Sequence, residues 1–302
     1  MIGRVVEVTT EGAHLAKERG FLVVKCRGEE LGRVALDDLD AVVGNAYGLT
    51  VSSNVIATLA ERNVPLVVCG QNHQPAAFLW PADGHYDQGG RISDQAAASK
   101  PLKKQLWKQI VRAKIAQQAA TLDAVGANSS GFHLLSKKVR SGDPENVEAQ
   151  AARRYWRLLF GDAFRRNAEG AGPNALLNYG YAVLRAGTAR AIMAAGLHPS
   201  LGLAHVNRKN AFALVDDCME PFRPVVDLFV HDLVYGGAKE LDQPVKAALA
   251  RVLITDMATG DGVTPVVTCL ERLALSLARC FGGETRKLVL PLKPLPLERV
   301  AR

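Results

Sequence analysis

Two hydrophobic patterns divide the chain at about residue 85. In the first part, apolar and β-branched residues come in short runs separated by glycines, which is typical of strands. The runs cover residues 2–8, 21–26, 33–36, 41–43, 64–69 and 76–80. A short helix is expected over residues 54–61, where Ser52 or Ser53 can cap the first turn. The first part is therefore predicted to be a small β-sandwich with one inserted helix.

Beyond residue 93, apolar residues recur at helical intervals instead. Helices are predicted over residues 101–124, 144–160, 174–195, 243–255 and 264–280, with a further helix that Asp216 can cap. Asp143 and Pro144 form a cap-and-proline start signal, and Gly161 and Gly196 are stop signals.

The fold class predicted by these patterns is α+β. A small N-terminal β-sandwich domain occupies residues 1–85, and a larger all-helical C-terminal domain occupies residues 93–302. The polar, glycine-rich stretch between them predicts a linker at 86–92. From residue 291 the chain is proline-rich and is expected to form an extended tail.

Composition bears on the compartment and the partners of the protein more than on its chemistry. The 302 residues include 37 lysines and arginines against 30 acids, and the net charge of +7 permits a polyanionic partner without requiring one. The five cysteines contain no C-x-x-C pair, which argues against a disulfide framework or zinc ribbon and favours a reducing compartment. No signal-peptide pattern or bilayer-spanning apolar stretch is present. We therefore expect a cytoplasmic protein without a membrane partner.

The segment 202–227 concentrates acids close to one histidine. The acids are Asp216, Asp217, Glu220 and Asp227. Separations of three, four and seven residues place them along one side of a helix. Such carboxylates repel each other unless a cation, a proton or an arginine compensates, and His205 lies just upstream in a glycine-containing loop. The segment is predicted to be half of a metal site.

Glu148 is the candidate for the other half. It lies in the predicted helix 144–160, with apolar residues at the following stripe positions, so its carboxylate is on the apolar side. That position is costly unless a partner compensates the charge. A neighbouring arginine or the helix dipole would explain Glu148 alone. Taken together with His205 and Glu220, a metal site is the better interpretation.

One imidazole and two carboxylates, without a thiolate, suit Mg²⁺ or Mn²⁺, whereas Zn²⁺ more often has a further histidine or cysteine. In a basic protein such an ion can activate a phosphodiester. The basic residues expected to hold phosphates, which are those of DNA if the resemblance described below holds, are Arg153, Arg154, Arg157, Arg208, Lys209, Arg223, Lys103, Lys104 and Lys108. Some of them can instead pair with the acids, and the three lysines are also typical of a solvated helix face.

Four segments resemble one known family. They are KKQLWKQIVRAKI at 103–115, SGDPENVEAQAARRYW at 141–156, NYGYAVLR at 178–185 and DDCMEPFRP at 216–224. With looser matches at 36–39 and 51–53, the chain resembles the CRISPR-associated integrase, a metal-dependent DNA endonuclease that inserts new spacers into CRISPR arrays, in its type II form. The resemblance extends to about residue 285.

The resemblance implies an N-terminal β domain used for dimerisation and a helical catalytic domain. The resemblance implies that Glu148, His205 and Glu220 are metal ligands and catalytic residues, and that Asp217 is a supporting acid. Many members of the family have Asp at the position of Glu220. The substrates would be two double-stranded DNAs, the spacer precursor and the CRISPR repeat. A 3′-hydroxyl of the spacer precursor would attack a phosphodiester at the boundary of the repeat. The expected assembly is a homodimer with a small partner subunit of the adaptation complex. Asp227 is then assigned to structure.

Two alternative functions stay open at this point. A non-catalytic DNA-binding scaffold, in which the acids only balance arginines, would bind DNA in a salt-sensitive way without strand transfer. A metal-dependent phosphoesterase acting on RNA or nucleotides would use the same ligands on another substrate. The motifs of phosphate-binding loops, dinucleotide folds and serine hydrolases are absent, which makes those three classes poor fits.

Overall fold

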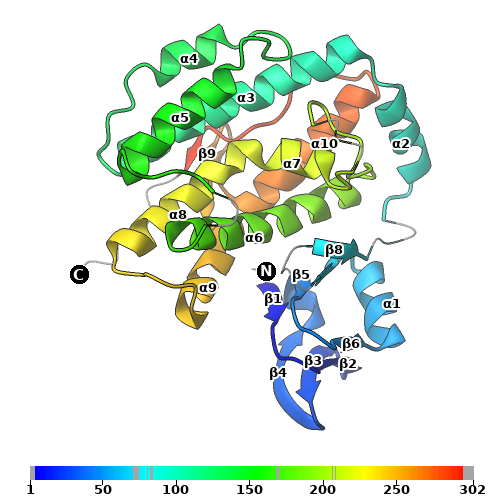
Figure 1. The fold of residues 1–302 in the computed structure, drawn as a ribbon. Helices are drawn as coiled ribbons and strands as arrows, with labels where there is room; N and C mark the ends of the chain where they lie inside the picture. Colours follow the sequence, from blue (N-terminus) through cyan, green and yellow to red (C-terminus); the bar gives the residue numbers. More distant parts are fainter. Residues whose placement is uncertain are drawn as a thin grey trace.

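The chain folds into a smaller strand-rich part and a larger helical part (Figure 1). The computed structural model describes residues 4–70, 75–79, 81, 84–167, 170–205, 207 and 209–294. Within these residues, no helix is both long enough and apolar enough to span a bilayer. The predicted α+β fold class is confirmed.

Two four-stranded sheets build the N-terminal part. Their strands are β1 (Arg4–Val8), β2 (His14–Glu18), β3 (Phe21–Cys26), β4 (Glu29–Ala35), β5 (Leu39–Gly44), β6 (Thr50–Val51), β7 (Leu66–Cys69) and β8 (Pro75–Phe78). In the sheet β1–β5–β7–β8 only β8 is antiparallel to its neighbour, and in the sheet β4–β3–β2–β6 only the pair β2–β6 is parallel.

Both sheets share one hydrophobic core with helix α1 (Ser53–Glu61). Val42 from the first sheet, Leu22 from the second and Leu59 from the helix are all buried in it. Ser52 caps the helix, because its side chain accepts a hydrogen bond from a backbone N–H of the first turn. The sandwich with one inserted helix is as predicted.

The helical part is arranged around α6, which contacts α7, α8, α9 and α10 and is buried over most of its length. The helices are α2 (Gln88–Ala97), α3 (Lys100–Ala124), α4 (Phe132–Lys138), α5 (Val147–Phe160), α6 (Pro173–Ala194), α7 (Ala213–Met219), η2 (Glu220–Phe222), α8 (Arg223–Tyr235), α9 (Gln243–Ala250) and α10 (Val266–Phe281). A single hydrophobic cluster runs through this part.

The helical part also contains a small antiparallel sheet, so the all-helical prediction for residues 93–302 needs a correction. Its strands are β9 (Asp256–Thr259), β10 (Gly262–Pro265) and β11 (Lys293–Pro294). The two-residue turn Gly260–Asp261 joins β9 to β10, and a glycine in such a turn favours a hairpin. The start of the predicted proline-rich tail pairs with β9 as β11, and residues from 295 lie outside the described ones.

Several predicted boundaries also move, and the starts of α2 and α5 are two of them. Helix α2 begins at Gln88, inside the segment predicted as a linker. Helix α5 begins at Val147, so Pro144 precedes the helix instead of opening it. Asp143 still caps the first turn, because its carboxylate accepts hydrogen bonds from the backbone N–H groups of Val147 and Glu148, at 3.0 Å each.

A buried polar cluster ties three helices together in the core. Tyr155 of α5 and Tyr181 of α6 donate hydrogen bonds to the two carboxylate oxygens of Asp227 in α8, at 2.9 and 2.5 Å. All three side chains are buried. Burial raises the pKa of Asp227 to about 7, while the two tyrosine hydroxyls act in the opposite direction. The structural role predicted for Asp227 agrees with this position.

Glu7 of β1 joins the strand-rich part to the helical part. Its carboxylate accepts a hydrogen bond from Tyr179 of α6 at 3.0 Å and pairs with Lys246 of α9 at 3.4 Å. Asn45, which follows β5, donates to the same carboxylate at 2.9 Å. A charged strand residue is therefore held by groups from both parts.

We expect Gly180→Ala to destabilise the protein, because a Cβ at Gly180 would lie 2.5 Å from a methyl carbon of Val226 in α8. Overpacking of this kind costs about 1–3 kcal/mol, measurable as a lower free energy of unfolding in urea. Gly89→Ala in α2 is the matched control. A Cβ there meets nothing within 4 Å, so the variant gains about 0.5–1 kcal/mol of helix propensity. Equal effects in both variants would contradict this packing.

We expect Asp227→Asn to change how stability depends on pH. Between the unfolded pKa of 3.8 and the folded value of about 7, the folded protein keeps a proton that the unfolded chain releases. The contribution of this carboxyl is thus complete below about pH 4 and is lost as the pH rises through 7, by roughly 1.4 kcal/mol per pH unit. The melting temperature of the unaltered protein, relative to the variant, falls from pH 4 to pH 7. A difference that is constant with pH would show that Asp227 ionises normally.

Candidate metal centre

The two predicted halves of the site meet at one lysine that the sequence analysis did not single out. Lys114 of α3 places its Nζ 2.6 Å from Oε1 of Glu148 in α5 and 2.5 Å from Oε2 of Glu220 in η2. Helix α3 packs against both of these elements. Glu148 and Glu220 are therefore close neighbours in space, as predicted, with an ammonium group between them.

Glu220 is the more buried of the two carboxylates, with only 6% of its side chain exposed against 23% for Glu148. Arg223, one turn later at the start of α8, lies 3.2 Å from it. Burial alone would raise the pKa of Glu220, but the positive charges of Arg223 and Lys114 outweigh burial and lower it. Glu220 is thus held as a carboxylate inside the core.

Asp217 shapes the loop that carries His205. Its buried carboxylate accepts hydrogen bonds from the backbone N–H groups of Leu203 at 2.6 Å and Ala204 at 3.1 Å, and it lies 2.5 Å from Nδ1 of His205. The hydrogen bond with Asp217 raises the pKa of His205 against the effect of burial, and Glu220 adds to the rise. With Nδ1 engaged, Nε2 is the imidazole nitrogen left for a ligand.

Two further side chains support the same loop. Gln95 of α2, fully buried, donates to the carbonyl oxygens of His198 and Leu201 and accepts from the backbone N–H of His198 at 2.8 Å. The ring of Trp107 packs edge-on against the ring of His205, with centroids 5.8 Å apart. The imidazole is therefore positioned from α2, α3 and α7 together.

Asp216 lies inside α7 rather than capping it, because the helix already begins at Ala213. Its carboxylate binds the guanidinium of Arg185 in α6 through two hydrogen bonds, of 2.8 and 2.9 Å, and also accepts from Asn210. This bidentate pair fixes α7 to α6. The sequence analysis offered a cap as one role for Asp216, and the structure shows an ion pair instead.

The donors present suit a hard divalent cation, although they are not yet gathered around one point. Among the described residues, no three His, Cys, Asp or Glu side chains are grouped closely enough to hold a metal. Lys114 stands between Glu148 and Glu220. Oε2 of Glu220 and Nε of Arg223 are buried without hydrogen-bond geometry, so their contacts are ion pairs only. Two carboxylates and an imidazole are a donor set that fits Mg²⁺ or Mn²⁺.

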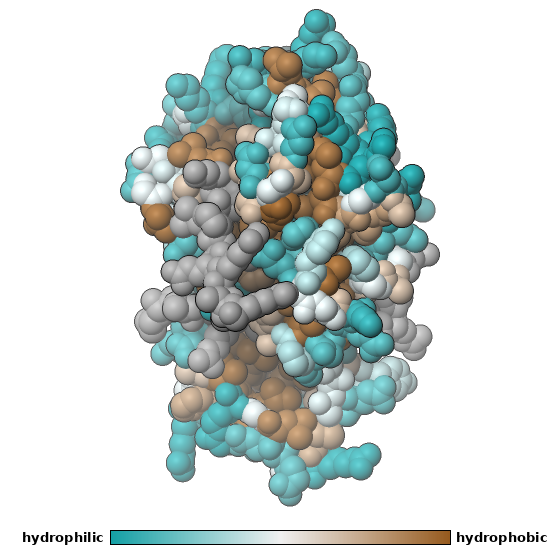
Figure 2. All heavy atoms as spheres, turned by 90° about the vertical axis from the view of Figure 1, so that its left-hand side faces the viewer, coloured by the Kyte–Doolittle hydropathy of each residue, from teal (hydrophilic) through white to brown (hydrophobic). Residues whose placement is uncertain are grey.

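The predicted DNA-binding residues lie on several elements, and some of them are engaged by other groups. Arg154 is held by the carbonyl of Ser130 and Arg157 by Asp162. Arg223 is engaged with Glu220 and with the ring of Tyr181. The others that are described are Arg153 and Lys209, together with Lys103, Lys104 and Lys108 on α3; Arg208 lies outside the described residues. Hydrophilic side chains cover much of the outer face of the helical part (Figure 2).

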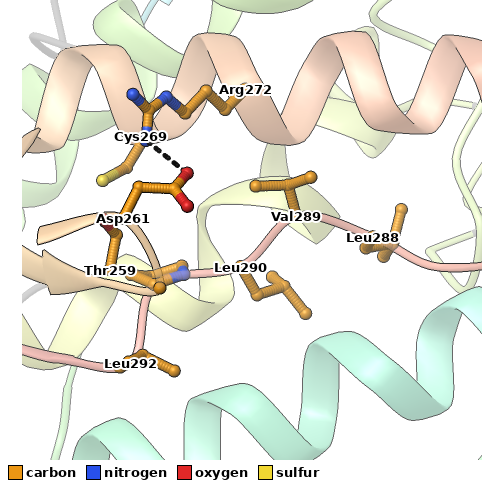
Figure 3. Close-up of a pocket in the computed structure, with 10 residues that line it drawn as sticks. Thr259, Asp261, Cys269, Arg272, Leu288, Val289, Leu290 and Leu292 are labelled. Carbon is orange, nitrogen blue, oxygen red and sulfur yellow. Dashed lines mark ion pairs between the residues drawn. The ribbon is translucent and has the colours of Figure 1, made fainter.

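A cavity of about 260 Å³ lies apart from this centre, between α10, the β9–β10 turn and residues 288–292 (Figure 3). Its lining is mostly apolar, with Cys269 and the pair Arg272–Asp261, 3.9 Å apart, on one side. Burial raises the pKa of the Cys269 thiol to about 11. The lining shares no residue with the candidate metal centre.

Sequence reasoning missed Lys114, although a signal for it was present. Lys114 continues the stripe formed by Leu106 and Ile110, which are both fully buried. The argument that singled out Glu148, a charge on an apolar stripe, applies equally to this lysine. Gln95, in contrast, gave no comparable signal, because its partners are backbone atoms about a hundred residues further along the chain.

Comparison with known proteins identifies the family and agrees with the fold. The family described as CRISPR associated protein Cas1 matches residues 6–259. A CRISPR-associated endonuclease Cas1 from Neisseria meningitidis is 38% identical over 80% of both chains. Another, from Pyrobaculum aerophilum, is 29% identical over 92% of this chain and 96% of its own.

Solved structures share the fold at low sequence identity. A casposase bound to its integration product has a TM-score of 0.80 at 19% identity, covering 94% of this chain and 92% of its own. A Cas1 protein from Thermotoga maritima has a TM-score of 0.75 at 16% identity, covering 93% and 98%. The family match runs from β1 in the strand-rich part to β9 in the helical part, and this chain therefore belongs to the family of CRISPR-associated Cas1 proteins.

Proposed function

We propose that this protein is a metal-dependent DNA integrase and endonuclease of CRISPR adaptation. The observation that carries the proposal is the meeting of Glu148 and Glu220 at Lys114, next to a His205 that Asp217 orients. The curated relatives are named endonucleases, and the casposase of the same fold is bound to an integration product. These names favour strand transfer on DNA over the scaffold and RNA alternatives.

Glu148, Nε2 of His205 and Glu220 would hold Mg²⁺ or Mn²⁺, and such an ion supplies a Lewis acid that polarises a phosphodiester. Asp217 keeps the imidazole in the orientation that leaves Nε2 available. Arg223 keeps Glu220 ionised. The basic residues around the centre would hold phosphates of the DNA. The attacking 3′-hydroxyl oxygen forms a bond to phosphorus as the bond to the 3′-oxygen of the cut strand breaks, so no covalent enzyme intermediate is required.

The proposed partners are double-stranded DNA, as spacer precursor and CRISPR repeat, a second copy of this chain, and a small adaptation subunit. A solved Cas6-RT-Cas1–Cas2 complex contains the same fold, with a TM-score of 0.72 at 17% identity. We assign dimerisation to the strand-rich domain at 1–85. The cytoplasmic location is inferred from the cysteine pattern alone.

The test is a strand-transfer assay with short 3′-hydroxyl DNA duplexes and a supercoiled plasmid carrying the repeat, in Mn²⁺ or Mg²⁺ and with the small subunit present. Glu148→Ala, His205→Ala and Glu220→Ala are each expected to lower the rate at least about 100-fold, since each removes a ligand. Glu240→Ala, which removes an exposed acid outside the site, is expected to transfer as well as the unaltered protein.

Transfer at the unaltered rate by Glu148→Ala and His205→Ala would disprove the assigned site. Salt-sensitive DNA binding without any metal-dependent transfer would favour the scaffold. Cleavage of a matched RNA substrate in preference to DNA would favour the phosphoesterase.

A further inference from the structure

Lys114 occupies a position that an ordinary lysine avoids. It lies on the buried stripe of α3, and only 12% of its side chain is exposed. Burial alone lowers the pKa of a lysine, but the carboxylates of Glu220 and Glu148 outweigh burial and raise the pKa of Lys114. Its charge is therefore kept in the core by the same two carboxylates that are the proposed metal ligands.

The charges of Lys114, Arg223, Glu148 and Glu220 balance one another, and Asp217 and His205 form a separate pair beside them. Lys114 and Arg223 carry two positive charges, and Glu148 and Glu220 carry two negative charges. A divalent ion added to this arrangement would place two excess positive charges in a poorly hydrated site, next to an ammonium group, which is unfavourable. Either the ammonium leaves the carboxylates or a polyanion enters with the ion.

The geometry also favours exchange over simple addition. The ammonium nitrogen lies 2.6 and 2.5 Å from one oxygen of each carboxylate, which is where a cation bridging the two would have to bind. Of the two contacts, only the one to Glu148 has hydrogen-bond geometry. Lysine is a compact charge on a flexible four-carbon stem, so it can withdraw without a change in the helix backbone.

We propose that Lys114 is an exchangeable counter-ion of the metal centre: it holds Glu148 and Glu220 together while no divalent ion is bound, and the ion replaces it between them. The proposal rests on the metal site of the proposed function. Lys114 is then a positioning residue that sets how tightly the ion binds. A DNA phosphate near the centre would receive the released ammonium, so that metal and DNA bind more tightly together than separately.

The test compares the Mn²⁺ affinity of purified variants without DNA, from the free-ion signal in electron paramagnetic resonance. Lys114→Met keeps an unbranched side chain on the apolar stripe but removes the competing charge, and we expect Mn²⁺ to bind at least about tenfold more tightly, a change of the size that close charge pairs produce. Lys114→Gln is expected to change in the same direction. Lys100→Met, which removes an exposed lysine at the start of the same helix, is the matched control with unchanged affinity.

Thermal unfolding provides a second readout. Without metal, Lys114→Met should melt below the unaltered protein, because two carboxylates lose their counter-ion. Saturating Mn²⁺ should close that gap. An equal loss of melting temperature with and without Mn²⁺, at unchanged Mn²⁺ affinity, would mean that Lys114 is only structural and would overturn the proposal.

The two proposals fail separately. If strand transfer requires Glu148 and His205 but Lys114→Met and Lys114→Gln bind Mn²⁺ no more tightly than the unaltered protein, the proposed function stands and the exchange is disproved. If both variants bind Mn²⁺ more tightly while transfer does not require Glu148, the exchange stands and the catalytic assignment is wrong.

Discussion

Two carboxylates inside a helical core must be neutralised, and this requirement organises the centre of the molecule. Helices α3 and α5 and the turn η2 each contribute one member of the arrangement Glu148–Lys114–Glu220, and α8 begins with the arginine that completes it. Apolar side chains of similar size would often give equal or greater stability at such a place. The charges are therefore better explained by chemistry than by folding.

The neighbouring acids show how environment separates residues that look alike in sequence. Glu220 is kept ionised by Arg223 and Lys114. Burial pushes Asp227, seven residues later, toward its protonated form, although two tyrosine hydroxyls donate hydrogen bonds to it and act in the opposite direction. The carboxylate oxygens of Asp217 accept hydrogen bonds from backbone N–H groups and contact the imidazole of His205. Within one short segment, Glu220 is thus a candidate metal ligand, Asp227 accepts hydrogen bonds in the core, and Asp217 holds the loop of His205.

Periodicity in the sequence was enough to predict the two parts of the fold and to mark Glu148, because burial of a face depends on local spacing. Periodicity did not predict contacts between side chains that are distant in the sequence. The carboxylate of Asp216 is taken by Arg185 of α6, so it does not cap the helix as its position suggested. Lys114 was missed because a lysine on a helix with several other basic residues is typical of a solvated face. The β9–β10 hairpin was passed over because short strands carry too few residues to show alternation.

The hydrogen bonds of Gln95 connect α2 to the segment that leads into the loop of His205. Helix α2 is the first helix after the strand-rich part. The side-chain amide of Gln95 forms hydrogen bonds with the backbone of His198 and Leu201. This backbone segment continues directly into the loop of His205. A displacement of α2 would therefore move the backbone that leads to the imidazole, although α2 contributes no side chain to the centre itself.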